Sequence, residues 1–246
     1  AGRDALLSNT TGSNNVAIGQ ASLRSNTTAS ENTSTGLNSL RSNTTGANNT
    51  ANGAGALYNN TTAGNNSAFG YKALYSNTTA GNNTAFGYRT LYLNTTGVNN
   101  VATGLQALYS NTTGDSNTAN GYEALKSNTT GSNNSAFGIS ALYSNTSASY
   151  NTAIGHAALH LNTTGTTNTA AGYNSLYTNT TGYENVGLGV YALKENVTGN
   201  FNTAVGTEAL YNNNASDNTA VGRRALYYNT SGTNNTAVGR NTLATN

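Results

Sequence analysis

The sequence lacks cysteine, proline, methionine and tryptophan, and only 7% of its 246 residues are charged. Without cysteine the chain can form no disulfide, no thiolate zinc site and no catalytic thiol. Only 35% of the residues are hydrophobic, and no stretch approaches the apolar length of a transmembrane helix. We therefore expect neither membrane contact within this segment nor an ordinary globular core.

Charge is also scarce and evenly spread. Ten basic residues face eight acidic ones, for a net charge of +2. So weak a bias predicts no nucleic-acid partner. Disordered chains are usually rich in charge and poor in aromatic residues, whereas this chain has 16 tyrosines. We therefore expect an ordered structure of an unusual kind.

A short internal repeat runs from residue 1 to residue 246, as a single array with no linker and no obvious caps. Its consensus is N-T-A-x-G-x-x-A-L-Y-S-N-T-T-G-x-N, and residues 66–82 show it cleanly. The step between the glycines of the N-T-A-x-G segment is 17 residues, except for the 16-residue step between Gly206 and Gly222. These glycines are Gly2, Gly19, Gly36, Gly53, Gly70, Gly87, Gly104, Gly121, Gly138, Gly155, Gly172, Gly189, Gly206, Gly222 and Gly239.

Some positions of the repeat hardly vary, while others drift freely. The leucine position and the asparagine three residues after it recur fifteen times each, and the opening asparagine recurs in all fourteen copies that include it. Alanine fills the position two after the opening asparagine, except at Ser34 and Gly187. We expect the constant positions to face inward and the drifting positions to face solvent.

The period predicts an all-β fold, a parallel β-solenoid (β-roll) of about 14.5 coils with 17 residues per coil. Frequent N-T-T-G segments disfavour helix. We expect two short strands per coil, N-T-A-F-G and A-L-Y-S, with Leu74, Leu91 and Leu108 stacked as an apolar spine. The residue missing from the short coil should lie in the turn at 212–217.

Two hypotheses account for the constant asparagines. Stacked asparagines can pair amide to amide from coil to coil, which satisfies buried polar groups. Alternatively, they are turn residues that bond the backbone of their own turn. The N-T-T and N-T-S segments also match the glycosylation pattern, although turn chemistry explains them equally well. Such segments begin at Asn9, Asn77, Asn111, Asn145 and Asn229.

Two outer positions carry large side chains. Tyrosine follows the leucine at Tyr58, Tyr75, Tyr92, Tyr109, Tyr143, Tyr177, Tyr211 and Tyr227. The residue before the glycine is often apolar, as at Ile18, Phe69, Phe86, Phe137, Ile154, Leu188, Val205, Val221 and Val238. Strand alternation predicts that this apolar stripe lies outside, interrupted by Asn52, Thr103 and Asn120. Its burial would require self-association, as a homotrimer or a filament; the alternative is a broader core that includes it.

Candidate catalytic residues are missing. His156 and His160 fall in one repeat without a third metal ligand, so we expect no metal site. The acidic residues are isolated, which leaves no paired carboxylates for acid–base chemistry. No phosphate-binding or nucleophile motif is present. The sequence thus predicts no enzyme, no catalytic residue and no cofactor.

The segments NNVAIG at 14–19 and NTAIG at 151–155 resemble the signature of the β-roll heads of trimeric autotransporter adhesins. The whole array is also similar to the repeat regions of phage tail-fibre proteins and bacterial surface fibre proteins. The resemblance implies a left-handed parallel β-roll, a trimer, and an extracellular place on a cell or virion surface. The 17-residue coil is longer than the adhesin head repeat, so trimer geometry does not carry over directly.

We therefore expect a structural or adhesive extracellular fibre segment, whose tyrosines would contact cell-surface glycans. The alternative is an ice-binding solenoid, because threonine follows the opening asparagine in nine of fourteen copies. Since both terminal repeats follow the consensus, we expect either a window from a longer array or subunits that stack end to end.

Overall fold

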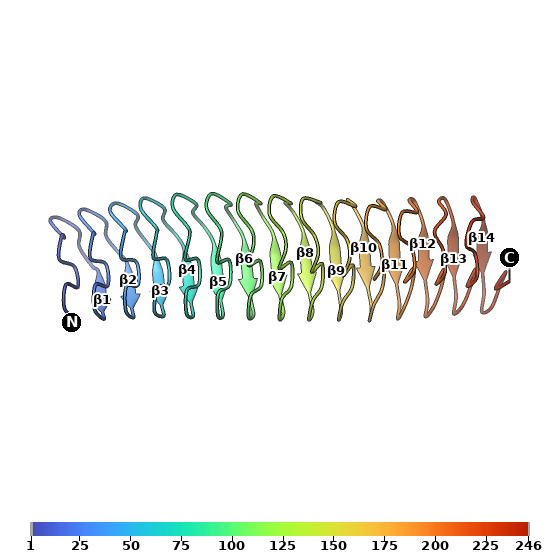
Figure 1. Ribbon diagram of the computed structural model, residues 1–246, viewed down its shortest axis with the longest axis horizontal. Helices are drawn as coiled ribbons and strands as arrows, with labels where there is room; N and C mark the ends of the chain where they lie inside the picture. Colours follow the sequence, from blue (N-terminus) through green and yellow to red (C-terminus); the bar gives the residue numbers. More distant parts are fainter. Residues whose placement is uncertain (1, 246) are drawn as a thin grey trace. The chain divides into compact units, whose positions relative to one another are not determined.

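The structure is a computed structural model that describes residues 2–245, and the chain divides into two compact units, Ala1–Ala119 and Asn120–Asn246. Within each unit the chain winds in coils that repeat the same path (Figure 1). All strands are parallel to their neighbours, so each unit is a parallel β-solenoid, as the period predicted. None of the described residues forms a helix that could cross a membrane.

Each coil contributes one strand of three residues. In the first unit the strands are β1 (Val16–Ile18), β2 (Thr33–Thr35), β3 (Thr50–Asn52), β4 (Ser67–Phe69), β5 (Thr84–Phe86) and β6 (Val101–Thr103). Equivalent residues of successive copies pair directly, for example Ala68 with Ala85. Strand β7 (Thr118–Asn120) lies at the boundary of the units.

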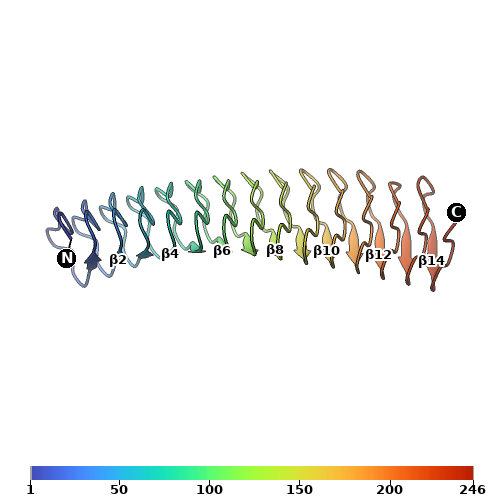
Figure 2. The same ribbon diagram turned by 60° about the horizontal axis from the view of Figure 1, so that its bottom comes forward.

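The second unit repeats this arrangement. Its strands are β8 (Ser135–Phe137), β9 (Thr152–Ile154), β10 (Thr169–Ala171), β11 (Val186–Leu188), β12 (Thr203–Val205), β13 (Thr219–Val221) and β14 (Thr236–Val238). They pair in sequence order, and the turned view in Figure 2 shows them side by side along one side of the coils.

The prediction of a second strand at A-L-Y-S was wrong, because this segment is a turn in every coil. Leu74 and Leu91 have φ of 52°, in the left-handed region that an extended strand does not use. That conformation costs a side-chain-bearing residue about 1–2 kcal/mol, and full burial of the leucine offsets it by a similar or larger amount. The backbone still bonds to the next coil, since the Leu74 N–H donates to the Thr90 carbonyl at 3.0 Å.

Glycine ends each strand for a steric reason. Gly70 has φ of +132°, and a Cβ at this position would lie 2.4 Å from the carbonyl oxygen of Gly87. Any larger residue would both strain the backbone and push the neighbouring coil away. The glycine period is therefore required by the close stacking of consecutive turns.

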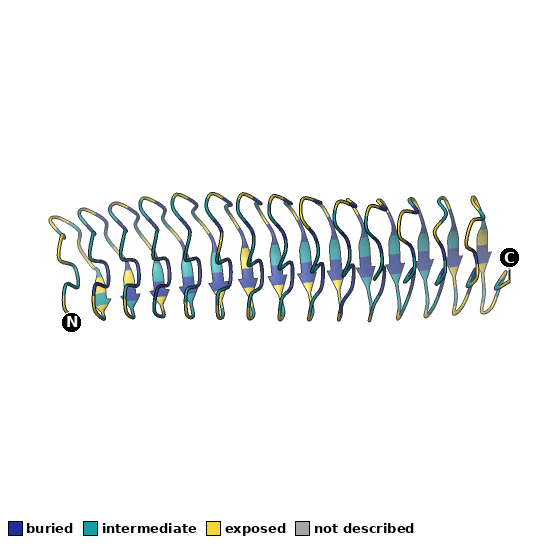
Figure 3. Ribbon diagram, viewed as in Figure 1, coloured by how far each residue is buried: buried dark blue, intermediate teal, exposed yellow. Residues whose placement is uncertain are grey.

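The core of each unit is thin and is built from the positions that do not vary. Leu74, Leu91 and Leu108 are fully buried, as are Ala68 and Ala85. Figure 3 shows buried residues at the centre of strands β2 to β14 and along the coils between them. The predicted leucine spine and inward-facing alanines are confirmed.

Both constant asparagine positions are buried, and both hypotheses about them hold in part. Asn77 Nδ2 donates to Asn60 Oδ1 at 2.9 Å, which is the predicted ladder, and also to the Ala80 carbonyl of its own turn at 2.9 Å. The opening asparagine works differently, because Asn49 Oδ1 accepts the backbone N–H of Asn66 at 3.0 Å. Asn66 Nδ2 then donates to the same Ala80 carbonyl at 3.0 Å. Each asparagine thus ties coils together as well as fixing a turn.

The short coil keeps the strand register. Strands β12 and β13 pair Ala204 with Ala220 although the step is 16 residues. The missing residue lies between Asn213 and Asn218, where Asn213 Nδ2 reaches the carbonyl of Ala215, two residues on, instead of a carbonyl three residues on. The prediction that the turn absorbs the deletion is confirmed.

The apolar stripe lies outside the core of each unit. Ile18 is 54% exposed and Phe86 41% exposed in the first unit, and Ile154 is 49% exposed in the second. Phe69 and Val205 are half-buried by their neighbours. The alternative of a broader core that encloses this position is therefore wrong.

Candidate functional site: the aromatic face

The tyrosines that follow the leucines stack on one another. In the first unit they form a ladder of Tyr58, Tyr75, Tyr92 and Tyr109, with ring centroids 5.0 to 5.3 Å apart and ring planes within 19° of parallel. Offset stacks at this distance contribute about 0.5–1.5 kcal/mol per pair beyond burial. The left-handed leucine beneath each ring repeats the same side-chain direction in every coil, which brings the rings into line.

A second, shorter ladder runs beside the first. Tyr71 and Tyr88, which follow the strand-ending glycines, stack at 5.4 Å. We call the two ladders together, Tyr58, Tyr75, Tyr92 and Tyr109 with Tyr71 and Tyr88, the aromatic face of the first unit. Rings inside a ladder have both faces covered by neighbouring rings. The sugar stacking expected from the sequence therefore requires a place where a ladder is interrupted.

Cations lie between the two ladders. Lys72 Nζ is 5.3 Å from the ring centroid of Tyr71 and 5.2 Å from that of Tyr75. Arg89 repeats this one coil later, with its guanidinium 5.2 Å from Tyr88 and 5.5 Å from Tyr92. These are cation–π distances. Hydrogen bonding to the Tyr71 hydroxyl raises the pKa of Lys72 above its usual value, so Lys72 is fully charged at neutral pH.

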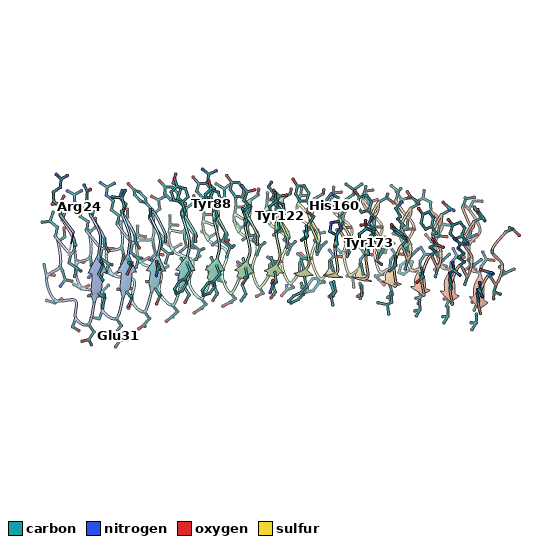
Figure 4. The ribbon with its side chains drawn as sticks, turned by 90° about the horizontal axis from the view of Figure 1, so that it is seen from below. Arg24, Glu31, Tyr88, Tyr122, His160 and Tyr173 are labelled. Atoms are coloured by element: carbon teal, nitrogen blue, oxygen red, sulfur yellow. The ribbon has the colours of Figure 1, made fainter. Side chains whose placement is uncertain are left out.

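The cations of the first unit have few acidic partners. One described ion pair of this unit joins Arg3 and Asp4 at 3.8 Å, away from Lys72 and Arg89 in the sequence. Figure 4 places Arg24 and Tyr88 at one edge of the coils and Glu31 at the opposite edge. Lys72 and Arg89 therefore leave positive charge on the aromatic face without a neighbouring carboxylate.

Three cations of the second unit have acidic partners instead. Lys126 pairs with Glu123 at 2.5 Å, Lys194 with Glu195 at 2.8 Å, and Arg224 pairs with Glu208. The hydrogen bond to Glu123 raises the pKa of Lys126, and burial raises the pKa of Tyr227. These three cations are thus paired with carboxylates, whereas Lys72 and Arg89 of the first unit lie beside tyrosines without a carboxylate partner.

Both histidines belong to aromatic stacks in the second unit. His160 lies between Tyr143 and Tyr177, with ring centroids 5.1 Å from each, and His156 stacks on Tyr173 at 5.3 Å. Figure 4 shows His160 and Tyr173 near the same edge. Within the described part of the chain, no three residues among histidine, cysteine, aspartate and glutamate cluster as metal ligands. The histidines act here as substitutes for tyrosine rungs.

The N-T-T asparagines are mostly inaccessible. Asn77, Asn111 and Asn145 are fully buried, and Asn229 is nearly so. Their side-chain amides donate hydrogen bonds within the ladder and the turn, as Asn145 Nδ2 does to Asn128 Oδ1 at 2.8 Å. Glycosylation needs a free, exposed amide, so the geometry favours turn chemistry as the reason for these segments.

One interruption of the shorter ladder leaves a hollow of about 170 Å³ in the first unit. We call it the notch. It forms where Ala54 and Gly55 replace the tyrosine and lysine of the next coil. Its remaining walls are Leu37, Asn38, Tyr58, Tyr71, Lys72 and Tyr75.

Sequence reasoning predicted the tyrosine position but missed the cations and the notch. The position two residues after each glycine varies between copies, so the sequence indicated only a surface position there. It is occupied, for example, by Gly55, Lys72 and Arg89. The signal that could have revealed them is spacing, because Lys72 lies one residue after Tyr71 and three before Tyr75. The side chains of Tyr71, Lys72 and Tyr75 meet at this spacing because Leu74, with its left-handed backbone, reverses the direction of the chain between them.

Taken together, these features define a repeat protein of the parallel β-solenoid class with an ordered aromatic surface. No protein-family model, curated protein or solved structure matches this chain. The resemblance to adhesin heads and fibre repeats thus stays a prediction from the sequence motifs alone.

Proposed function

We propose that this chain is a structural and adhesive segment of an extracellular fibre, on a cell or virion surface. The observation that carries the proposal is that one repeat provides both the hydrogen bonds that hold the coils together and the tyrosines on their surface. Buried asparagine ladders hold successive coils of each unit together, and in the first unit four successive coils, from Tyr58 to Tyr109, present stacked tyrosines. A surface of this kind offers one weak contact many times, and linked weak contacts bind with high avidity.

The exposed apolar stripe supports self-association. Ile18 and Phe86 in the first unit and Ile154 in the second are about half exposed. Phe69 and Phe86 also stack on each other at 4.5 Å, which forms a flat apolar surface. A second or third copy of the chain would cover this stripe, as a homotrimer or a filament does.

Sedimentation velocity of the purified chain tests the assembly. We expect the mass of an oligomer for the parent, and a shift toward the monomer for Phe86→Ser. Leu105→Ser is the matched control, because Leu105 is similarly exposed, at 42%, but belongs to a different position of the coil. A parent that sediments as a monomer at every concentration would refute the assembly.

Adhesion is tested with chains coated on beads at high density. We expect coated beads to bind glycan-covered surfaces more tightly than the soluble chain does, because avidity requires many simultaneous contacts. Immunogold labelling of the source organism tests the location, and label confined to the cell interior would contradict the proposal.

Ice binding is the second candidate, and it is favoured by the row of threonines at equivalent positions of adjacent strands. Thr33 pairs with Thr50 in adjacent strands, and Thr203 with Thr219. The neighbouring outward rank, however, mixes Phe69, Phe86 and Asn52, which differ widely in size and would interrupt a flat surface. Thermal hysteresis of the purified chain separates the two functions, since a fibre segment should show none.

A further inference from the structure

We propose that the notch above Gly55 binds one acidic sugar ring of an anionic polysaccharide, stacked against Tyr71 and paired with Lys72. This inference rests on the adhesive function proposed above and names its ligand. The site lies wholly within the first unit, between Leu37 on one side and Tyr71 on the other.

The notch is a missing rung of the shorter aromatic ladder. Tyr71 has Tyr88 on one face at 5.4 Å, but in the coil before it the equivalent residue is Ala54. Leu37 and Tyr71 stand two coils apart, about 10 Å at the spacing of neighbouring strands. One flat ring placed midway would meet Tyr71 at nearly the distance that separates the tyrosines themselves. Tyr71 is 43% exposed, so its ring is available to a ligand.

Glycine keeps the notch open. Gly55 has φ of +70°, and a Cβ there would lie 3.2 Å from Lys72 Cγ and 3.6 Å from the Tyr75 ring. Residues with side chains adopt a similar φ at the equivalent positions, 57° for Asn38 and 53° for Lys72, so it is the missing side chain of Gly55 that leaves the hollow open. The equivalent residues one and two coils later are Lys72 and Arg89, which occupy this space in their own coils.

The walls match an acidic sugar in chemistry. Tyr71 supplies an aromatic surface for the apolar face of a pyranose ring, and Asn38 and the Tyr58 hydroxyl offer hydrogen bonds to its hydroxyl groups. Lys72 lies over Tyr71 with no carboxylate partner, and Arg41 donates to the Tyr58 hydroxyl beside it. A ring that carries a carboxylate would satisfy this charge, whereas a neutral ring would leave it unpaired.

Calorimetric titration of the full chain with trigalacturonate tests the site. Ala54→Tyr restores the missing rung, so we expect it to abolish binding while the protein stays folded, since tyrosine fills the same position in the next two coils. Lys72→Gln should weaken binding about tenfold through loss of a charge-assisted hydrogen bond. The matched controls are Leu105→Tyr and Arg89→Gln, which introduce a tyrosine and remove a cation at the equivalent positions of coils without the notch and should keep parental affinity. Circular dichroism melting verifies the fold of each variant.

Other outcomes overturn the proposal. Parental affinity in Ala54→Tyr would show that the ligand does not enter the notch, and equal binding of neutral galactotriose would show that Lys72 does not select charge. Tighter binding of adenosine monophosphate would assign the notch to a nucleotide instead. If the parent binds no trigalacturonate but still assembles and adheres when coated on beads, this site fails and the fibre function stands. If it binds trigalacturonate but neither assembles nor adheres, the reverse holds.

Discussion

The side chain of Asn214 replaces a backbone carbonyl that other coils supply to their neighbours. Its Oδ1 accepts the backbone N–H groups of Val197 at 3.0 Å and Thr198 at 2.9 Å. In an ordinary coil of the same unit, the Thr180 carbonyl accepts both corresponding N–H groups, from Thr163 and Thr164. The short turn lacks a carbonyl in the right place, and the asparagine side chain restores the acceptor.

Replacing Asn214 with alanine should therefore lower the free energy of unfolding of the shortened coil. We expect a loss of about 1 kcal/mol, because two exposed hydrogen bonds are removed. Hydrogen exchange at the amides of Val197 and Thr198 should accelerate, while that of amides several coils away stays unchanged. Asn214→Asp keeps the acceptor and should retain protection. Equal exchange in both variants would show that the Asn214 side chain does not hold this turn.

The leucine spine should dominate the stability of each coil. Leu108→Ala removes a fully buried side chain, and we expect a loss of about 2–5 kcal/mol. Leu105→Ala in the same coil is the control, since an exposed leucine should contribute within about 0.5 kcal/mol. The amide of Leu91, which bonds to the carbonyl of Ala107 in that coil, reports the difference by hydrogen exchange. Similar protection in the two variants would mean that leucine is not the spine.

The asparagine ladder should be intolerant of interruption. Asn77→Ala would leave Asn60 Oδ1 and Asn94 Nδ2 each without their bond to Asn77. Asn94 Nδ2 keeps its bond to the Gly97 carbonyl, so the buried atom left unpaired is Asn60 Oδ1, at a cost of about 1–3 kcal/mol. Thr79→Ala alters an exposed residue of the same turn and should change little. A chemical denaturation midpoint shared by both variants would contradict a structural role for the ladder.

Alkaline pH should destabilise the second unit. The pKa of Lys126 is raised above its usual 10.5 by Glu123, and the pKa of Tyr227 is raised above 10.0 by burial. The folded state holds these protons more tightly than the unfolded state, so their contribution is complete below about pH 10 and is lost as the pH rises through the folded values. The melting temperature should fall between pH 9 and 12. Its fall should be less steep in Lys126→Met than in Arg223→Met. Parallel curves for the two variants would remove the Lys126–Glu123 pair as a cause.

The period was sufficient to predict the coil, its inside and its outside. Leucine, alanine and asparagine hold their positions because each must meet an identical neighbour one coil away, and such a constraint is visible in a single sequence. The conformation of Leu74 was not predictable in this way. Nothing in the residue type marks a left-handed leucine, and local preferences favour a strand. Closing a coil in 17 residues overrides that preference.

The candidate site was predictable only in its most regular part. Eight tyrosines at one position are conspicuous, whereas Gly55 and Lys72 differ from their equivalents in every adjacent coil. A site that forms where residues differ from the consensus cannot be distinguished, in one sequence, from ordinary variation at a surface position. Its meaning depends on which side chains surround the gap, and only coordinates give that.

The asparagine ladder also gives each unit a direction. Asn77, Asn94 and Asn111 each donate a side-chain N–H to the asparagine of the coil before, so Asn77 and Asn94 donate to one neighbour and accept from the other. The amide dipoles thus align head to tail, and hydrogen bonds in such chains polarise one another. A coil added in the opposite sense would bring like groups together, donor against donor or acceptor against acceptor. The two ends of a ladder are therefore chemically distinct, since one offers a free acceptor and the other a free donor. Further coils can add to such a ladder in one orientation only.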